Sequence, residues 1–329
     1  MAGWSLFCPR CGWESGGEEY YPRCPRCGSP LEIRGHLPRL PRTLGEGGTP
    51  LVRRGQIWYK LEYLNPTGSF KDRGTALSIA LASRLGYKCV VEDTSGNTGI
   101  SVAAYAAASG IRATIHSPTT IARGKAAIIK RLGAKLVLHK TREEAAAAAQ
   151  RDSSRCFYVA HAYSPIFLEG ISSIAGELKD VATRTKVLVP VSSGTLLLGL
   201  ARGLRRLGVN SHIIAVQAVE AASLESSIPV LARGSGKTSK LADALVLRNP
   251  PRLGEMARTA RGVVITSDPD IREAWVRLNR SGFIVEPSSA TVEAARSMLG
   301  LSRAVLILTG SGLKYAVDSE TQITLSSRA

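Results

Sequence analysis

The regular alternation of short apolar strands with helices is the feature that most constrains the fold of this 329-residue chain. Segments rich in β-branched residues are followed by segments of helical composition, an order typical of α/β layers around mostly parallel sheets. The expected strands are 57–63, 89–92, 112–116, 135–139, 186–191, 212–219, 262–266 and 303–308. The expected helices are 76–85, 100–108, 125–132, 143–150, 268–281 and 289–299. A chain of this length buries one large core or two linked cores.

One loop between a predicted strand and a predicted helix carries a lysine. In open α/β sheets, ligands bind at the carboxyl ends of strands, where loops lead into helices. The loop 65–74 (Asn-Pro-Thr-Gly-Ser-Phe-Lys-Asp-Arg-Gly) predicts a turn with Ser69 as the N-cap of the next helix. Lys71 then lies in the first helical turn, where the helix dipole disfavours a cation and lowers the pKa of the amine. The spacing alone fits an amine nucleophile and a surface lysine beside Asp72 equally well.

Three further loops place small polar residues beside a predicted helix start or strand end. The backbone amides of 95–98 can hold a carboxylate, and those of 192–195 can hold a phosphate together with neighbouring hydroxyls. The hydroxyl at position 309 can hydrogen-bond a heterocyclic nitrogen. Taken alone, the last two loops are better explained by a capped helix and a glycine turn. The residues concerned are Ser95, Gly96, Asn97, Thr98, Ser192, Ser193, Gly194, Thr195 and Thr309.

Residues 1–34 contain a doubled cysteine motif. Cys8-Pro-Arg-Cys11-Gly recurs as Cys24-Pro-Arg-Cys27-Gly, and each copy predicts a tight turn that presents two thiolates. Four thiolates at this spacing are typical of a structural zinc ribbon. Two disulfides and an iron site are the alternatives. We expect zinc, because a segment this short lacks a core large enough to fold without a metal.

The composition limits the cellular setting and the partners. Lys+Arg (43) exceed Asp+Glu (26), which gives a net charge of +17. The basic residues are spread along the chain, which favours a heat-adapted source or anionic small ligands over nucleic acid. Neither a secretory signal at 1–9 nor a membrane-spanning run is visible, so we expect a cytoplasmic protein without a membrane partner. The two remaining cysteines, Cys89 and Cys156, are expected to be buried and inert.

Five motifs, taken in order, resemble the fold-type II pyridoxal-phosphate (PLP) enzymes of the tryptophan-synthase-β family, and within it the threonine synthases. The paired cysteine turns are also similar to those of some members. The motifs are 45–51, 65–74, 95–99, 286–290 and 308–314. The resemblance implies two open three-layer α/β lobes plus the zinc ribbon, and a homodimer. The implied boundaries are 1–34 for the ribbon, 35–82 and 163–329 for a large PLP-binding lobe, and 83–162 for a small mobile lobe.

The resemblance also implies a role for each candidate residue. Lys71 binds PLP as a Schiff base and later removes the Cα proton of the substrate. Asn97 contacts the 3′-oxygen of the cofactor, and 95–98 hold the substrate carboxylate. Residues 192–195 hold the cofactor phosphate, and Thr309 faces the pyridine nitrogen. A neutral hydroxyl does not keep that nitrogen protonated, which favours elimination and replacement over transamination.

The implied reaction converts O-phosphohomoserine and water to threonine and phosphate, and the sequence departs from this pattern at the substrate site. The segment 161–170 matches a stretch that carries a phosphate-binding arginine in threonine synthases. Phe167 stands at the arginine position and offers no bidentate contact to an anion. Ser-Ser-Gly-Thr at 192–195 likewise replaces Gly-Asn-Ala-Gly-Asn. His161 is either a substitute contact or a core or strand-end histidine.

Several other functions therefore compete with the implied one. A serine/threonine dehydratase and an O-phosphoserine-dependent β-replacement enzyme use the same scaffold, and Phe167 favours them. A nucleic-acid-binding ribbon protein is suggested by the net charge and the cysteine turns, although the ribbon lacks interleaved aromatic residues. A PLP-binding protein without turnover is the last alternative.

Overall fold

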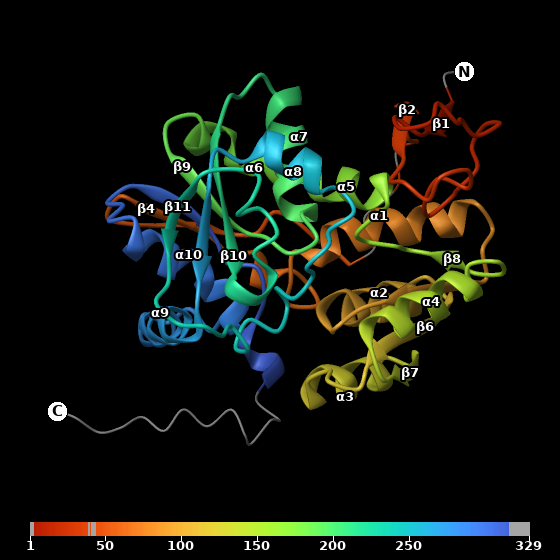
Figure 1. The fold of residues 1–329 in the computed structure, drawn as a ribbon. Helices are drawn as coiled ribbons and strands as arrows, with labels where there is room; N and C mark the ends of the chain where they lie inside the picture. Colours follow the sequence, from red (N-terminus) through yellow and green to blue (C-terminus); the bar gives the residue numbers. More distant parts are fainter. Residues whose placement is uncertain (1–2, 39, 41–43, 316–329) are drawn as a thin grey trace.

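The computed structural model describes residues 3–38, 40 and 44–315. These residues form three sheets, with two, seven and four strands (Figure 1). Every strand and helix predicted above overlaps an observed element of the same type, and the predicted α/β fold with two layered units and a small N-terminal unit is confirmed. The predicted ribbon and large lobe extend into residues outside the described ranges, namely 1–2, 39, 41–43 and 316–329. Among the described residues, no helix is long and apolar enough to cross a membrane.

The seven-stranded sheet has the order β11-β12-β10-β9-β13-β4-β3, and its neighbouring strands are parallel except for the β3–β4 pair. Its strands are β3 (Leu51–Arg54), β4 (Ile57–Lys60), β9 (Lys186–Pro190), β10 (His212–Ala218), β11 (Val230–Arg233), β12 (Val263–Thr266) and β13 (Ala304–Ile307). The central strands are continuous apolar runs because helices cover both of their faces. Val187 and Val189 pack with the helices of one face, whereas Leu188 packs with those of the other.

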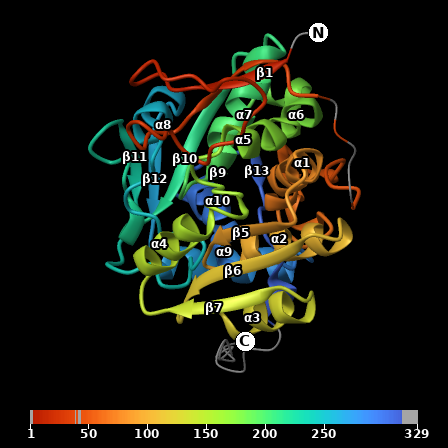
Figure 2. The ribbon, with the colours of Figure 1, turned by 90° about the vertical axis from the view of Figure 1, so that its right-hand side faces the viewer.

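Two groups of helices form the outer layers of this sheet. One face is covered by α9 and α10, and the other by α5, α6, α7 and α8 (Figure 2). Their bounds are α5 (Pro165–Ser172), α6 (Ile174–Ala182), α7 (Thr195–Arg206), α8 (Leu253–Thr259), α9 (Asp268–Arg280) and α10 (Pro287–Met298). The start of α9 is fixed by a capping box between Ser267 and Asp270, as its Ser-Asp-Pro-Asp sequence favours.

The four-stranded sheet is parallel throughout, with the order β7-β6-β5-β8. Its strands are β5 (Cys89–Asp93), β6 (Arg112–Pro118), β7 (Lys135–His139) and β8 (Phe157–Tyr158). Helices α2 and α3 cover one face and α4 covers the other, while α1 packs between α2 and α5. Their bounds are α1 (Lys71–Arg84), α2 (Asn97–Ala108), α3 (Arg123–Arg131) and α4 (Arg142–Asp152).

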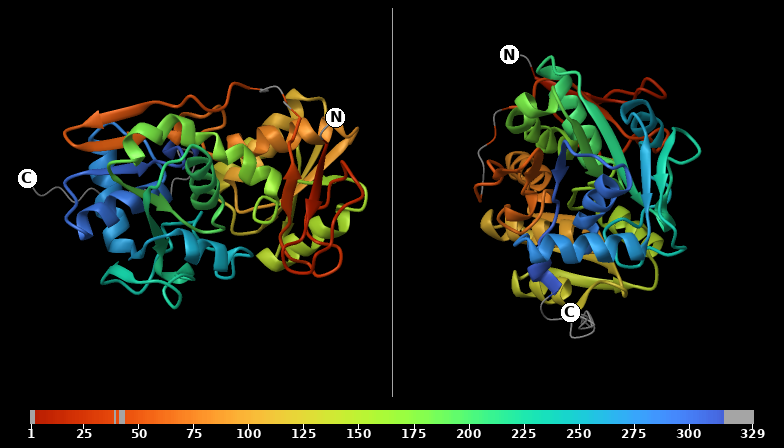
Figure 3. Two further views of the ribbon diagram at one scale, coloured as in Figure 1. Left: turned by 90° about the horizontal axis from the view of Figure 1, so that it is seen from above. Right: turned by 90° about the vertical axis from the view of Figure 1, so that its left-hand side faces the viewer.

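The N-terminal unit pairs β1 (Trp4–Phe7) with β2 (Glu32–Gly35) and contacts both α/β units (Figure 3). The Tyr20 ring stacks on Phe157 with centroids 3.9 Å apart, and its hydroxyl donates to the Tyr158 carbonyl at 2.6 Å. On the other side, Glu32 pairs with Arg202 of α7 at 2.6 Å. The N-terminal unit is thus held against β8 of the four-stranded sheet and against α7.

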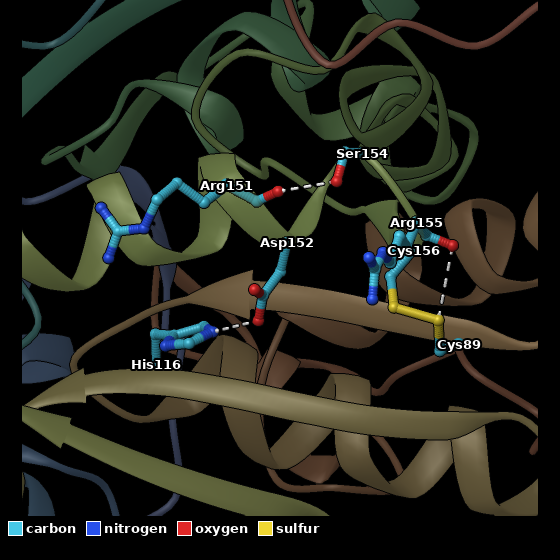
Figure 4. Close-up of a disulfide and its surroundings, with 7 residues drawn as sticks. All are labelled: Cys89, His116, Arg151, Asp152, Ser154, Arg155 and Cys156. Carbon is cyan, nitrogen blue, oxygen red and sulfur yellow. Dashed lines mark hydrogen bonds and ion pairs between the residues drawn. A yellow bond between two sulfur atoms is a disulfide. The ribbon is translucent and has the colours of Figure 1, made fainter.

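The expectation that Cys89 and Cys156 are buried and inert is wrong, because they form a disulfide and both are partly exposed (Figure 4). Val90 of β5 is the register partner of Phe157 in β8, so the preceding residues of these parallel strands lie side by side. Their Cα atoms are 4.9 Å apart, within disulfide range. The bond joins positions separated by 67 residues, and the sequence alone does not give the strand register that brings them together.

Candidate active site

The predicted site residues lie together around one cavity, which is lined by loops from both α/β units. Its atom-free space, including the open mouth, is about 700 Å³. Its lining contains Lys71, Ser95, Asn97, Thr98, Ser192, Ser193, Gly194, Thr195 and Thr309. Of the predicted residues, only Gly96 is not in the lining. These loops follow β5, β9 and β13, so the rule that ligands bind at the carboxyl ends of parallel strands holds here.

Lys71 is the first residue of α1, and its side chain lines the cavity. Nζ is 4.9 Å from the ring centroid of Phe70 and 5.6 Å from that of Phe167. Loss of hydration lowers the pKa of Lys71 to about 7; Glu92 opposes this shift and the positive charge of Arg142 adds to it. Burial, more than the helix dipole invoked above, is therefore the main cause of the lowered pKa. An amine that is largely neutral near pH 7 is suited to act as a nucleophile and a base.

The expectation that Ser69 caps this helix is wrong. Phe70 already has a helical conformation and occupies the cap position, which makes no side-chain cap hydrogen bond. The reason is that the chain before α1 is held by the end of β13: Ser69 bridges Gly310, and the Phe70 amide donates to the Thr309 carbonyl at 3.1 Å. The Ser69 hydroxyl is buried and makes no hydrogen bond to a described residue.

The residues that follow Lys71 hold the loop in place. Asp72 is fully buried and accepts a hydrogen bond from the Thr67 amide at 2.7 Å and one from the Ser101 hydroxyl at 2.6 Å. Arg73 is also buried and pairs with Glu62 at 2.7 Å and with Glu177 at 2.8 Å. These contacts fix the turn on one side of Lys71 and the first helical turn on the other. Their role is to position the lysine.

The loop 95–98 opens α2 beside the cavity. The Asn97 amide nitrogen donates to both carboxylate oxygens of Glu286 at 3.0 Å, and its oxygen accepts from Lys314 at 2.7 Å. The side chain is therefore held in one orientation at the helix start. A Cβ on Gly96 would lie 2.4 Å from the Lys125 side chain, so the backbone passes too close there for another residue. The contact of Asn97 with the cofactor oxygen stays a prediction.

The loop 192–195 forms a cradle at the start of α7, and this cradle fits a phosphate. Gly194 occupies the N-cap position with φ +85°, and no side chain caps the helix, so its first amides have no side-chain partner. A Cβ on Gly194 would lie 2.5 Å from the sulfur of Met256. The hydroxyls of Ser193 and Thr195 are 3.3 Å apart at the cavity wall. Hydroxyls and uncapped amides at a helix start are the groups that bind phosphates in proteins.

Thr309 lies at the end of β13, where its hydroxyl oxygen is 3.0 Å from that of Ser289. Ser289 in turn accepts a hydrogen bond from the Gly310 amide at 2.8 Å. The threonine is thereby positioned by the start of α10, and it lines the cavity. Its predicted contact with a heterocyclic nitrogen stays a prediction.

Phe167 and His161 mark where the cavity departs from the expected pattern. Phe167 is fully buried in α5, and its ring lies against Gly74 and below Lys71. Its ring centroid is 5.9 Å from that of His161, which lines the cavity. The Nδ1 atom of His161 forms a short hydrogen bond with Glu92, a buried residue of β5. His161 is buried, follows β8 and lines the cavity, and its part in substrate binding stays a prediction.

Sequence reasoning missed Arg142, Lys125 and Glu286 as cavity residues. Arg142 begins α4 after β7, and Lys125 lies in α3 after β6, so the strand-end rule could have identified both. Glu286 belongs to one of the recognised motifs but was assigned no role. Lys125 pairs with Asp243 at 2.7 Å and lies 3.8 Å from Glu286.

A larger groove lies at the opposite ends of the strands of the four-stranded sheet. It is lined by Cys89, Arg112 and Lys135, the first residues of β5, β6 and β7. It contains none of the predicted site residues, and the amino ends of parallel strands are not where α/β sheets hold their ligands. We therefore place the candidate active site in the smaller cavity around Lys71.

The four N-terminal cysteines are brought together by β1, β2 and their turns. Their sulfur atoms all lie within 4.8 Å of one another, and Cys8–Cys27 and Cys11–Cys24 are each 3.6 Å apart. Four sulfurs at about 2.3 Å from a tetrahedral zinc ion are separated by about 3.8 Å. The arrangement therefore fits the predicted metal.

The fold and the cavity together define a fold-type II PLP enzyme of the α/β class. Residues 42–310 match the family described as pyridoxal-phosphate dependent enzyme, and the chain belongs to this family. The cradle at 192–195 and the buried amine of Lys71 fit PLP, because they offer a phosphate site and an aldehyde-reactive amine in one cavity.

Known relatives carry different names. The threonine synthase of Methanocaldococcus jannaschii is 30% identical over 309 residues, which cover 83% of this chain and 76% of the relative. A probable cysteine synthase of Bacillus subtilis is 28% identical over 300 residues, which cover 82% of this chain and 93% of the relative. The crystal structure of O-ureido-L-serine synthase has a TM-score of 0.72 at 22% identity, covering 88% of this chain and 98% of that one. This last likeness concerns the fold alone.

Proposed function

We propose that this chain is a PLP-dependent lyase of the threonine synthase type, which converts O-phosphohomoserine and water to threonine and phosphate. The observation that carries the proposal is the common cavity: a half-buried lysine of lowered pKa, a cradle that fits a phosphate and an amide-rich loop face one another there. Relatives named threonine synthase at about 30% identity support the choice of substrate.

When bound, PLP acts as an electron sink for the substrate amino acid. The cradle at 192–195 would hold its phosphate, and Lys71 would hold its aldehyde carbon. The neutral amine of Lys71, once released, takes the proton from Cα at its Nζ atom, as its lowered pKa permits. The amides of 95–98 orient the substrate carboxylate at the start of α2. The hydroxyl of Thr309 contributes no charge, which is compatible with elimination and replacement.

A substrate panel tests this function. The holoenzyme is incubated with O-phosphohomoserine, O-phosphoserine, serine and threonine, and released phosphate and amino-acid products are measured. We expect phosphate and threonine in equal amounts from O-phosphohomoserine, and neither from Lys71→Ala. The absence of threonine with the wild-type enzyme would refute the proposed reaction.

A second candidate is a β-replacement enzyme that uses O-phosphoserine. It is favoured by Phe167, which stands where threonine synthases carry an arginine, and by the relative named probable cysteine synthase. In the same panel, phosphate released from O-phosphoserine in the presence of sulfide, with cysteine as the product, identifies this reaction. The two candidates differ in the length of the carbon chain between Cα and the phosphate.

We further propose that Cys8, Cys11, Cys24 and Cys27 bind one structural zinc ion. The proposal is supported by their sulfur separations and by their position in a unit that contacts both α/β units. Elemental analysis is expected to give one zinc per chain in the wild type and none in Cys24→Ser. Cys156→Ser is the matched control, because this cysteine lies outside the ribbon, and its zinc content should equal that of the wild type.

A further inference from the structure

Arg142 is a cavity cation that forms no ion pair with a described residue. It is the first residue of α4, directly after the β7–α4 turn, and it lines the cavity with Lys71 and Lys125. Lys125 is neutralised by Asp243 at 2.7 Å, and Lys71 has a lowered pKa. Among residues 3–38, 40 and 44–315, no ion pair or side-chain hydrogen bond includes the Arg142 guanidinium. Such a guanidinium in a partly enclosed cavity is a strong site for an anion.

His161 faces the same region. Its Nδ1 atom is bound to Glu92, while its Nε2 atom has no hydrogen-bond partner among the described residues. Burial raises the pKa of Glu92 well above its ordinary range and lowers that of His161. The proton between them then belongs to Glu92, which donates to Nδ1 and leaves Nε2 as an N–H donor. Lys71, Arg142 and His161 line the same cavity, and the positive charges of the first two also lower the pKa of His161.

The anions that the proposed reaction brings into this cavity can be assigned one by one. The cofactor phosphate has the cradle at 192–195, and the substrate carboxylate has the amides of 95–98. The remaining anion is the phosphate on the substrate side chain. In the family pattern, an arginine at position 167 binds this phosphate. This chain has Phe167 there, and its side chain is fully buried.

We propose that Arg142 and His161 together bind the side-chain phosphate of the substrate, and that they replace the arginine missing at position 167. The inference rests on the proposed function, since it assigns the site for its leaving group. Arg142 supplies a bidentate charged contact from α4, and His161 donates from Nε2 while Glu92 fixes its orientation. The phosphate site has thus moved from α5, beneath Lys71, to the ends of β7 and β8.

The test measures binding without turnover. The probe is the phosphonate isostere of O-phosphohomoserine, in which a methylene replaces the ester oxygen, and L-norvaline serves as the same carbon chain without the phosphonate. Both are titrated into holoenzyme while the cofactor absorbance is followed. The cradle at 192–195 is filled by the cofactor in this experiment, so the phosphonate cannot bind there.

We expect Arg142→Ala to weaken phosphonate binding about 100-fold, and His161→Ala about 10-fold, because charged hydrogen bonds are lost. Norvaline affinity should change less than about twofold in both variants. Arg142→Lys keeps the charge without the planar fork and should lose about tenfold. Arg151→Ala, at the other end of α4, is the matched control and should bind both probes as the wild type does.

The inference is overturned if Arg142→Ala binds the phosphonate within twofold of the wild type, or if it loses affinity for norvaline equally. Thermal melting identifies a variant that is unfolded, in which case Arg142→Lys decides by the same criterion. The proposed function fails by a different result, namely no phosphate release from O-phosphohomoserine by the wild type. A chain that binds the phosphonate through Arg142 but does not release phosphate keeps the inference and loses the proposed reaction.

Discussion

The two walls of the cavity are built differently. The cofactor wall, which we define as 192–195 and Thr309, belongs to the seven-stranded sheet and consists of backbone amides and hydroxyls without charge. The substrate wall, defined as Arg142 and His161 with the buried Glu92 behind His161, belongs to the four-stranded sheet and consists of ionisable side chains. Lys71 lies between them at the start of α1.

The difference follows from the group that we propose each wall binds. A phosphate at a helix start is held by the backbone, so a short local motif with a glycine is sufficient. The phosphate on a substrate side chain lies several bonds from Cα and is bound by long protein side chains. Such side chains can come from several strand ends. The first wall is therefore recognisable as contiguous sequence. The second is assembled from positions 92, 142 and 161, which no single motif contains.

The largest effect on activity is expected from replacing Lys71, which lies between the two walls. Lys71→Ala should lower kcat at least about 10³-fold, because it removes both the nucleophile and the base. The absorbance band of the lysine-bound cofactor should disappear, while the variant keeps the wild-type melting temperature within a few degrees. If the variant retains that band, another amine holds the cofactor and the assignment of Lys71 is wrong.

Most of the fold and the cofactor wall could be predicted from the sequence because their signals are local. Alternating apolar strands and helices indicated the layers, and each strand-end loop carried its own motif of small polar residues. The same locality made Lys71 recognisable. The errors concern long-range pairing. The disulfide depends on the register of β5 and β8, and the failed cap at Ser69 depends on the pairing of Ser69 with Gly310.

The substrate wall was largely missed for the same physical reason. Arg142 lies between the predicted strand 135–139 and the predicted helix 143–150, so only the general strand-end rule points to it, and no motif accompanies it. Only the pairing of the strands in the four-stranded sheet brings Arg142 near His161 and Glu92. The loss of the arginine at 167 was visible from the sequence, but its replacement required the three-dimensional arrangement.

The disulfide offers a way to weaken the sheet of the substrate wall alone. Cys89→Ser should lower the free energy of unfolding by about 4 kcal/mol at most, since the bond closes a loop of 67 residues. We expect phosphonate binding to decline near the melting temperature before cofactor binding does. Differential calorimetry with and without a reducing agent measures the effect. A reductant that shifts the wild type and Cys89→Ser equally would contradict it.

The complementary change perturbs the cofactor wall. Gly194→Ala places a Cβ at φ +85° and within 2.5 Å of the Met256 sulfur, which costs about 1–2 kcal/mol. The dissociation constant of the cofactor, measured by absorbance titration of the cofactor-free protein, should rise about 10-fold. Gly176→Ala is the control, because a Cβ there meets nothing within 4 Å. Once cofactor is saturating, the phosphonate affinity of Gly194→Ala should be unchanged, and a parallel loss would show that the walls are coupled.

The smallest expected effect is on the pH dependence of cofactor capture, because Arg142 of the substrate wall influences the pKa of Lys71. Only the neutral amine attacks the cofactor aldehyde, so the rate of cofactor capture should rise about tenfold per pH unit and level off above about pH 7. Arg142→Ala should move this plateau to higher pH, because the positive charge of Arg142 lowers the pKa of Lys71. Stopped-flow absorbance on cofactor-free protein measures both curves. A rate that keeps rising to about pH 10 would show an ordinary, hydrated lysine. An unshifted plateau in Arg142→Ala would show that Arg142 lies too far from the Lys71 amine to take part in the substrate wall.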